Sequence, residues 1–439
     1  MDDTVITGGT VWTGAGWIKA AVGIKDGRVT SLSARPGPAA QTVDARGLRV
    51  LPGLIDSHVH FDLGVGATRT ADDFAGGSRA AAFGGVTTVI DFLDPVKTAA
   101  QMAAAFDSRL ALAQKSCVDF SFHTTLAGPT DPAEALVKQA RDLGCPSLKV
   151  FTAYSSTDRR TSDRTICNLL TAGAKAGTTV LVHAENESLM DLAPGTPVAR
   201  HEESRPAACE VTAVLGLAEL VSTTGGRLYV VHTNVGTTVE RLQKLHPSLL
   251  GKTLFLETCP HYLLWNKNRY ARPDGARFTM TPPLRSEDER RKLADAFDAF
   301  HTLGTDHCAY DAAQKDHATT ERIPMGIGGV EFLLPSLWGR FGEKCLSKLT
   351  TNPARIHGLG SRKGNLLPGA DADVVLFDPQ ARWTAAAHHG KADHSAWVGE
   401  PLAGRIVSTL VRGRFVVQEG ELRGGSGQFV PRTPALKHP

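Results

Sequence analysis

The middle of the chain alternates short, continuously apolar runs with alanine-rich segments that favour helices, and this alternation constrains the fold most. Eight apolar runs occur, at residues 53–60, 86–92, 120–126, 147–151, 179–183, 228–232, 253–256 and 302–306. Helix-favouring segments between them include residues 99–114, 133–143, 166–176, 210–222 and 287–300. Strands without polar alternation are buried on both faces, and parallel neighbours need crossover helices. Eight such units predict an α/β protein with a (β/α)8 TIM barrel.

The two ends of the chain show a different sequence pattern, with short strand-like runs separated by turn signals. Asp26-Gly27 between apolar runs is a hairpin signal near the N-terminus. The runs at residues 373–377, 406–411 and 415–417 repeat this pattern near the C-terminus. We therefore expect a discontinuous β-sandwich domain built from residues 1–51 and 365–439, and a barrel of residues 52–364. The glycine-rich tail after Arg423 is expected to form an extended arm.

Composition and charge exclude several classes of protein. Lys and Arg number 48 against 45 Asp and Glu, a net charge of +3 without a long basic run, so no nucleic-acid partner is expected. The 42% hydrophobic and 21% charged residues are typical of a globular protein rather than a disordered one. Seven scattered cysteines without a CxxC pair argue against a disulfide framework and a Cys-zinc site. No apolar stretch of about 18 residues and no signal-peptide pattern is found, so we expect a cytoplasmic protein without a membrane partner.

Potential metal ligands occupy the carboxyl ends of five of the eight predicted strands, where the functional residues of a barrel collect. These residues are His58, His60, Lys149, His183, His232 and Asp306. Each alone has an ordinary explanation: a core histidine with satisfied hydrogen bonds, a lysine paired with an acid, or an aspartate that caps a helix. Six such residues at one end of one barrel are hard to explain in this way, so together they predict a metal centre.

The number and type of these side chains indicate two ions rather than one. Imidazole and carboxylate ligands suit zinc, iron, manganese or nickel rather than a thiolate-bound metal. One catalytic ion needs only three protein ligands and a water, whereas two ions about 3.5–4 Å apart would use the whole set. Lys149 lies inside a buried strand, where its amine must lose its charge or find a partner. Reaction with CO2 would convert it into an anionic carbamate that bridges both ions.

Ten short segments along the chain form a specific set. They are PGLIDSHVH (52–60), TADDF (70–74), AFGGVTT (82–88), KVFTAY (149–154), VHAEN (182–186), ETCPHY (257–262), PPLR (282–285), GTDHC (304–308), NPARI (352–356) and PGADAD (368–373). In these segments the chain resembles the amidohydrolase superfamily, and within it the hydantoinase and dihydropyrimidinase group. The resemblance implies a hydrolase that opens the amide C–N bond of a cyclic imide or ureide, such as a 5-substituted hydantoin or a dihydropyrimidine.

The resemblance also implies a role for each candidate residue. The implied ligands are His58, His60 and Asp306 for one ion, and His183 and His232 for the second, with carboxylated Lys149 as the bridge. Both ions are expected to be zinc. A metal-bridging hydroxide would attack the ring amide carbon, and Asp306 would carry its proton to the leaving nitrogen. The hydroxyl of Tyr154 would stabilise the developing oxyanion.

The substrate-binding positions depart from the pattern of this group. Its members hold the ring mainly through backbone groups of a Ser before Pro-Pro and an Asn before Gly, and this chain has Thr281 and Met325 there. Backbone contacts survive a change of side chain, so a cyclic amide is still expected as the substrate. Phe61, Leu63 and Val65 follow the first strand, and their apolar side chains favour an apolar or aromatic 5-substituent.

Several alternative functions were weighed against this one. Allantoinase shares the metal ligands and a cyclic ureide substrate, and stays open. A dihydroorotase would carry an Arg where this chain has Asp62, whose carboxylate would repel the substrate. Isoaspartyl-peptide or N-acyl-amino-acid hydrolysis would need a basic residue near the mouth, with Arg69 and Arg285 as candidates, but Arg285 lies in a segment shared with hydantoinases. A non-catalytic scaffold is disfavoured because all six ligand positions are filled.

The end of the chain bears on assembly. Residues 427–432 resemble the tails that members of the group pack against neighbouring subunits. A homo-oligomer, either a dimer or a tetramer, is therefore expected.

Overall fold

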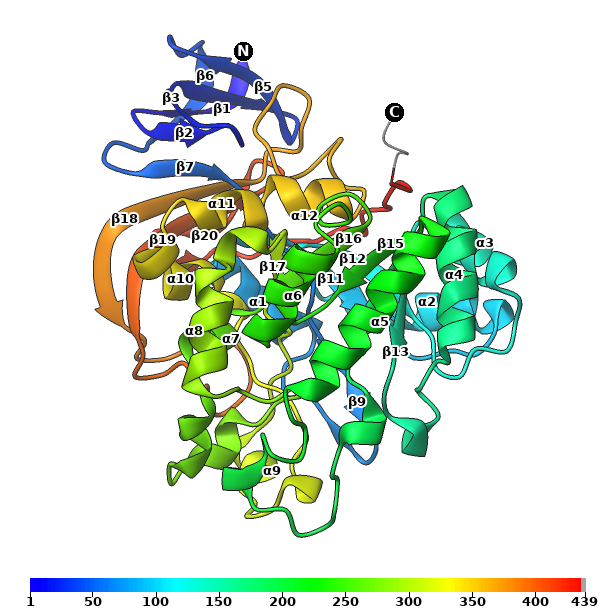
Figure 1. Cartoon of the computed structure of the whole chain (residues 1–439). Helices are drawn as coiled ribbons and strands as arrows, with labels where there is room; N and C mark the ends of the chain where they lie inside the picture. The colour runs from blue at the N-terminus through cyan, green and yellow to red at the C-terminus, as the bar shows by residue number, and fades with distance from the viewer. Residues whose placement is uncertain (436–439) are drawn as a thin grey trace.

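A sheet of eight parallel strands surrounded by helices forms the centre of the computed structural model, which describes residues 1–435 (Figure 1). In pairing order the strands are β8 (Leu54–Asp56), β11 (Val86–Phe92), β12 (Asp119–Thr125), β13 (Ser147–Phe151), β14 (Thr179–His183), β15 (Arg227–Val230), β16 (Leu254–Thr258) and β17 (Thr302–Leu303). A parallel bridge between Val59 and His307 joins the last strand region to the first and closes the barrel. The predicted barrel is confirmed.

Three strands, β11, β13 and β14, have the bounds predicted from their apolar runs, whereas the first and last strands are shorter than predicted. The run at residues 302–306 yields only β17, and three residues after this strand the backbone is left-handed at Asp306, whose φ is 49°. His232 lies just after β15 and has a φ of 40°. The backbone at these two ligand positions is left-handed, a conformation incompatible with a continuing strand.

Helices follow the strands around the barrel. They are α1 (Phe74–Phe83), α2 (Ala99–Ala113), α3 (Ala133–Asp142), α4 (Asp163–Ala176), α5 (Ala208–Thr224), α6 (Gly236–Leu245), α7 (Pro260–Leu264), α8 (Glu287–Asp295), α9 (Ala312–Lys315), α10 (Leu333–Phe341), α11 (Lys344–Leu349) and α12 (Thr351–Ile356). Helix α4 shows why they form: Ser162 caps its first turn, and Gly177 ends it with a φ of 70°. Ile166, Leu169 and Leu170 recur at helical spacing and bury one face.

Two further sheets are built from the ends of the chain. One has the order β5 (Arg28–Ser33), β4 (Ala21–Lys25), β1 (Asp2–Thr7), β6 (Ala39–Asp44). The other has the order β21 (Glu421–Leu422), β20 (Arg414–Gln418), β19 (Pro401–Val411), β18 (Val374–Thr384), β7 (Arg49–Pro52), β2 (Thr10–Trp12), β3 (Trp17–Lys19). N- and C-terminal segments meet where β7 pairs with β18, and a shared apolar core that includes Val22 and Leu376 lies between the sheets. The predicted sheet structure from both termini is thus confirmed.

The tail packs on this chain's own barrel. Phe429 bridges to Phe120 at the start of β12, and its ring lies 5.1 Å from that of Phe106. Arg432 is 4% exposed and donates hydrogen bonds to the Phe122 carbonyl and to the hydroxyls of two serines. Residues 427–432 are therefore engaged within the subunit, while Gln428 and Pro431 stay exposed, so packing of the tail on a neighbouring subunit remains a prediction. Residues 436–439 of the predicted C-terminal segment lie outside the described residues.

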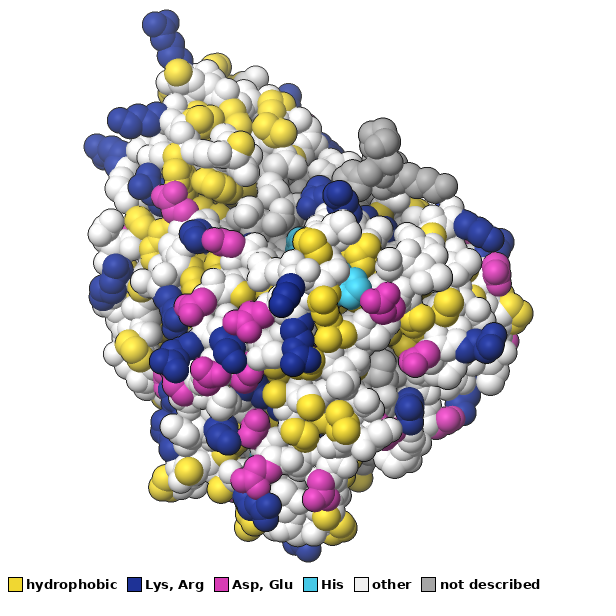
Figure 2. All heavy atoms as spheres, in the orientation of Figure 1, with side chains coloured by type: hydrophobic (Ala, Val, Ile, Leu, Met, Phe, Trp, Pro, Cys, Tyr) yellow, Lys and Arg dark blue, Asp and Glu magenta, His cyan; other side chains and the backbone are white. Residues whose placement is uncertain are grey.

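Charges of both signs are mixed on the surface. Figure 2 shows the densest mixture over α8, where residues 287–292 are all acidic or basic. Lys292 and Asp288 form an ion pair at 2.9 Å on this helix. Among the described residues, no helix combines the length and apolarity needed to cross a membrane.

Candidate metal centre

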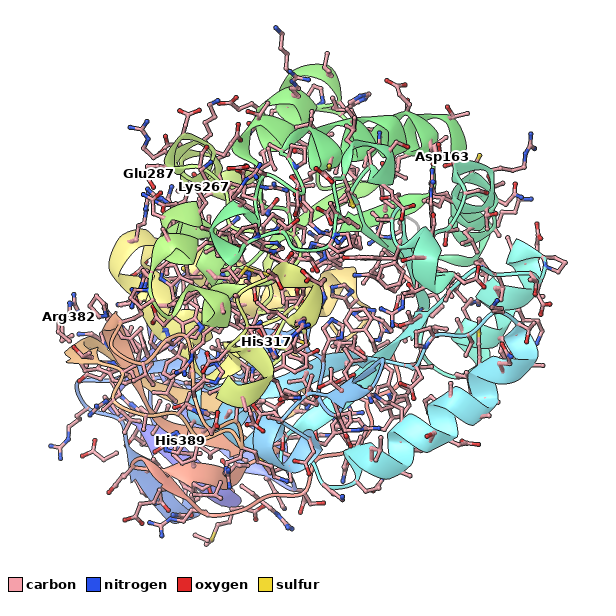
Figure 3. All side chains as sticks on the ribbon, turned by 90° about the horizontal axis from the view of Figure 1, so that it is seen from below. Asp163, Lys267, Glu287, His317, Arg382 and His389 are labelled. Atoms are coloured by element: carbon pink, nitrogen blue, oxygen red, sulfur yellow. The ribbon has the colours of Figure 1, made fainter. Side chains whose placement is uncertain are left out.

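The candidate ligands gather at the carboxyl end of the barrel, the lower end in Figure 1, where the hairpin β9 (Gly64–Val65) and β10 (Thr68–Arg69) and helix α9 also lie. Figure 3 looks onto this end, and His317, two residues after α9, is labelled near the middle of the view. The loops that follow the strands therefore surround the site, as in barrel enzymes generally.

His58, His60 and Asp306 form one group. Their ligand atoms lie within 4.8 Å of one another, and Asp306 Oδ1 is 3.1 Å from the Nε2 atoms of both histidines. Although burial alone would raise it, the neighbouring His58 and His60 hold the pKa of the Asp306 carboxyl well below its usual range. The carboxylate is thus available as an anionic ligand.

His183 and His232 form a second pair beside the first. Nδ1 of His183 lies 3.0 Å from Nε2 of His232, and the His232 ring is stacked at 5.6 Å from the His58 ring. Burial lowers the pKa of His183 and holds the pKa of His232 well below its usual range. Both rings are therefore neutral, the form in which imidazole binds a metal.

Lys149 points from β13 into the same space. Its side chain is 3% exposed, and its Nζ lies 5.2 Å from the Phe92 ring and 5.5 Å from the Phe151 ring. Within residues 1–435, no hydrogen bond or ion pair engages Nζ. Burial lowers the pKa of Lys149 to about 8, against the opposing charges of Asp306 and Glu257.

These residues fit a metal centre. His58 Nε2 is buried and, although it lies 3.1 Å from Asp306 Oδ1, makes no hydrogen bond of acceptable geometry in the described chain. Buried polar atoms without partners are costly and rare, and a metal ligand atom needs no hydrogen bond. The donor set consists of imidazole nitrogens, a carboxylate and a buried amine, which suits zinc and similar metals.

Two buried carboxylates orient the histidines, and the sequence analysis assigned them no role. Glu257 Oε1 lies 2.7 Å from His58 Nδ1, and Glu185 Oε2 lies 2.7 Å from His183 Nε2. Arg205 donates a hydrogen bond to Glu185 at 2.6 Å. Burial alone would raise the pKa of Glu185, but Arg205 and His183 lower it to about 2. Such partners fix the ring orientation of metal-binding histidines. Glu257 could have been found from its place at the carboxyl end of β16.

Tyr154 and Thr281 meet at the side of the site. The Tyr154 hydroxyl donates a hydrogen bond to Thr281 Oγ1 at 3.2 Å and also lies 3.2 Å from His183 Nε2. Burial raises the pKa of Tyr154, so its hydroxyl keeps its proton. Tyr154 has a φ of 75°, left-handed like His232 and Asp306, and such strain costs about 1–3 kcal/mol per residue and clusters at functional sites.

The two segments that contain Thr281 and Met325, the residues that differ from the pattern of the group, lie against each other. The Gly326 backbone N–H donates a hydrogen bond to the Thr279 carbonyl at 3.1 Å. Met325 is partly buried and packs against the core. The structure thus brings the Met325 segment to the segment of Thr281, and through it to Tyr154.

Phe61 does not lie where the sequence analysis placed it. Its side chain is completely buried, and its ring lies 5.7 Å from that of Phe74 and 5.3 Å from that of His307. Phe61 therefore belongs to the hydrophobic core of the barrel. This corrects the expectation that Phe61 contacts the substrate, whereas Leu63 and Val65 remain partly exposed.

The charged residues near the mouth are engaged with protein groups. Arg69 Nη1 pairs with Asp62 Oδ1 at 2.5 Å, so the charge that was expected to repel dihydroorotate is compensated. That argument against a dihydroorotase is therefore weaker than the sequence suggested. Arg285 is buried and donates hydrogen bonds to the Arg205 carbonyl and to Asn234 Oδ1. Both guanidinium groups are thus held by protein groups, although Nη2 of the buried Arg285 has no hydrogen-bond partner among the described residues.

Comparison with known proteins agrees with this arrangement. The model of the Amidohydrolase family matches residues 49–416. A D-hydantoinase from Ralstonia pickettii is 34% identical over 98% of this chain and 99% of its own length.

Solved structures show the same relationship. The D-hydantoinase from Bacillus sp. AR9 superposes with a TM-score of 0.93 at 34% identity, covering 98% of this chain and 99% of that one. A dihydropyrimidinase from Brevibacillus agri NCHU1002 gives a TM-score of 0.92 at 31% identity, with 99% of both chains covered. The chain therefore belongs to the amidohydrolase family, as a hydrolase of the hydantoinase group.

Proposed function

We propose that this protein opens the amide C–N bond of a cyclic imide or ureide, with a 5-substituted hydantoin or a dihydropyrimidine as the substrate class. One observation carries the proposal: two groups of ligand atoms, His58–His60–Asp306 and His183–His232, lie side by side around the unpaired amine of Lys149. Relatives named D-hydantoinase and dihydropyrimidinase support the choice of substrate.

The proposed centre contains two zinc ions. His58, His60 and Asp306 would hold one, His183 and His232 the other, and Lys149, carboxylated by CO2, would lie between them. Such ions polarise a carbonyl group and lower the pKa of a bound water towards neutrality. The lack of any acidic partner for Lys149 within the described residues supports its modification, because an unpaired buried ammonium is costly.

The remaining chemistry falls to side chains of the barrel mouth. A carboxylate oxygen of Asp306 would accept the proton of the attacking water and deliver it to the leaving ring nitrogen. The hydroxyl of Tyr154 would donate a hydrogen bond to the developing oxyanion. Backbone groups beside Thr281 and Met325 would hold the ring, and their position next to Tyr154 supports this role.

The test is a ring-opening assay on protein reconstituted with zinc and bicarbonate. The panel contains dihydrouracil, hydantoin, a 5-aryl hydantoin, allantoin, dihydroorotate and a simple cyclic imide. Turnover of hydantoins or dihydrouracil is the expected result, and turnover of allantoin alone would make the protein an allantoinase. Absence of both metal and activity would instead indicate a scaffold.

A matched variant separates catalysis from contamination. Asp306→Asn keeps the side-chain shape but removes the proton acceptor, so turnover should fall about 10²–10⁴-fold. Equal activity of the variant would refute the assigned role of Asp306.

We also propose that the protein is a homodimer or a homotetramer. Light scattering on the purified protein measures the number of subunits.

A further inference from the structure

Lys315, at the end of α9, is buried and lies against the two segments proposed to hold the substrate. Its side chain is 1% exposed. Its Nζ donates hydrogen bonds to the Thr279 carbonyl at 2.8 Å, to Thr279 Oγ1 at 2.9 Å, to the Pro324 carbonyl at 2.8 Å and to the Gly326 carbonyl at 3.0 Å. One ammonium group therefore contacts both segments.

The positions of these oxygens are informative. Pro324 and Gly326 flank Met325, and Thr279 lies two residues before Thr281. Convergent carbonyl oxygens repel one another and are costly when buried without a donor. An ammonium at their centre offsets that repulsion and sets the distance between the two segments. No carboxylate in the described chain lies within ion-pair distance of Nζ, so backbone carbonyls and one hydroxyl surround the charge.

Helix α9 is itself fixed to the rest of the mouth. Gln314, the neighbour of Lys315, donates hydrogen bonds to Thr68 Oγ1 at 2.6 Å and to the Arg69 carbonyl at 3.1 Å. The hairpin of β9 and β10 is thereby joined to the same helix. The helix thus connects the loop after the first strand with both segments that face the ring.

The Gly326 backbone shows how closely this region is packed. Gly326 has a φ of 146°, and a Cβ added there would lie 2.6 Å from Cβ of Cys308. Only glycine accommodates this conformation and this approach. Segment 324–326 is therefore closely packed against Cys308, and in this conformation the carbonyls of Pro324 and Gly326 accept hydrogen bonds from Lys315.

We propose that Lys315 is a positioning residue, which holds segments 279–281 and 324–326 at the spacing that the ring of the substrate requires. The inference rests on the proposed function of these two segments as the walls of the substrate site. Lys315 acts through them and does not touch the reacting atoms.

The experiment compares Lys315→Met with a matched control, Lys348→Met. Lys348 is 7% exposed and also donates hydrogen bonds to backbone carbonyls, those of Asp298 and Phe300, which precede β17 at the opposite end of the barrel. Both variants remove a buried ammonium from a group of carbonyls. Only Lys315→Met disturbs the proposed substrate segments.

Two measurements on the reconstituted enzyme test the proposal. In Lys315→Met, KM for the best substrate of the panel should rise about tenfold or more, with kcat within about threefold of the wild type, because binding is lost in ground and transition state alike. Hydrogen exchange of the Gly326 amide, which is bonded to the Thr279 carbonyl, should become faster. Metal content should not change. Lys348→Met should alter neither KM nor this exchange rate.

Several results would overturn the inference. They are wild-type KM and Gly326 exchange in Lys315→Met, equal effects in both variants, or loss of metal from Lys315→Met. If Lys315→Met does not fold, Lys315→Gln, which keeps two N–H donors, is compared in the same way. If the wild type opens no ring of the panel, the proposed function fails, and Gly326 exchange still decides whether Lys315 holds the two segments.

Discussion

Glu257 contacts residues of both proposed metal sites, so its replacement by glutamine tests how the centre is held together. Its Oε1 lies 2.7 Å from His58 Nδ1 and accepts a hydrogen bond from the His232 backbone N–H at 3.0 Å. Its Oε2 accepts a hydrogen bond from the Tyr229 hydroxyl at 2.7 Å. Glutamine has the same shape, but in one orientation its NH2 group would face the His232 N–H group, and in the other the Tyr229 hydroxyl would have to accept rather than donate.

The expected effect is on metal affinity. Loss of a group that orients a ligating histidine weakens metal binding about 10–100-fold, equivalent to ~1.4–2.7 kcal/mol of binding free energy. We therefore expect Glu257→Gln to bind zinc more weakly by this factor. Competition with a chelator of known affinity, starting from metal-free protein in bicarbonate, measures it directly. At saturating zinc the variant should recover much of its activity.

Glu210 supplies the matched control. It is 2% exposed and accepts hydrogen bonds from the backbone N–H groups of Asn234 and Val235 at 2.9 and 3.1 Å, without touching a proposed ligand. Glu210→Gln should change stability but leave zinc affinity as in the wild type. The reasoning is refuted if Glu257→Gln binds zinc as tightly as the wild type, or if both variants lose affinity equally.

Three further predictions concern the oxyanion donor, the metal and a buried carboxyl group. Tyr154→Phe should lower kcat about 10²–10³-fold at unchanged metal content, because a donor to the oxyanion is lost; kinetics with metal analysis checks both, and a wild-type kcat would exclude the role. Chelation should abolish activity, and zinc with bicarbonate should restore it in the wild type but not in Lys149→Ala; a restored variant would contradict the carbamate. Burial raises the pKa of Glu210 from 4.5 to about 7, so the folded state holds this proton more tightly than the unfolded state, and the resulting stability is complete below pH 4.5 and lost as the pH rises through 7. Urea unfolding at several pH values should show that the free energy of unfolding of the wild type falls as the pH rises through 7, whereas that of Glu210→Gln does not. The same pH dependence in both proteins would contradict the raised pKa of Glu210.

The sequence predicted that the candidate ligands lie together, because each of them lies in a strand or just after its end. His183 is the last residue of β14, and Lys149 lies inside β13, so the order of strands determines where both go. Parallel strands of a barrel end on one face, and residues far apart in the chain are therefore brought together. The predicted groups lie at contact distance for this reason, as the 3.0 Å between His183 and His232 shows.

Other features depend on contacts that no local pattern contains. Phe61 directly follows the strand end that carries His58 and His60, where an apolar loop residue was expected, yet its ring packs inward against Phe74 and His307. The sequence of residues 427–432 does not show that Phe429 and Arg432 contact β12 of their own barrel. Such contacts depend on which cavities the folded core leaves to be filled.

The sequence by itself determined the barrel, the paired terminal sheets and the set of candidate ligands, because apolar runs and their order can be read directly along the chain. Only the tertiary structure decided which way each side chain points and what supports it. Glu257 beside His58, Glu185 beside His183 and Lys315 among four oxygens are long-range contacts made after the strands close. A buried polar group needs a hydrogen-bond partner, but the amino-acid sequence does not show which residue that partner is. The geometry of the closed barrel determines it.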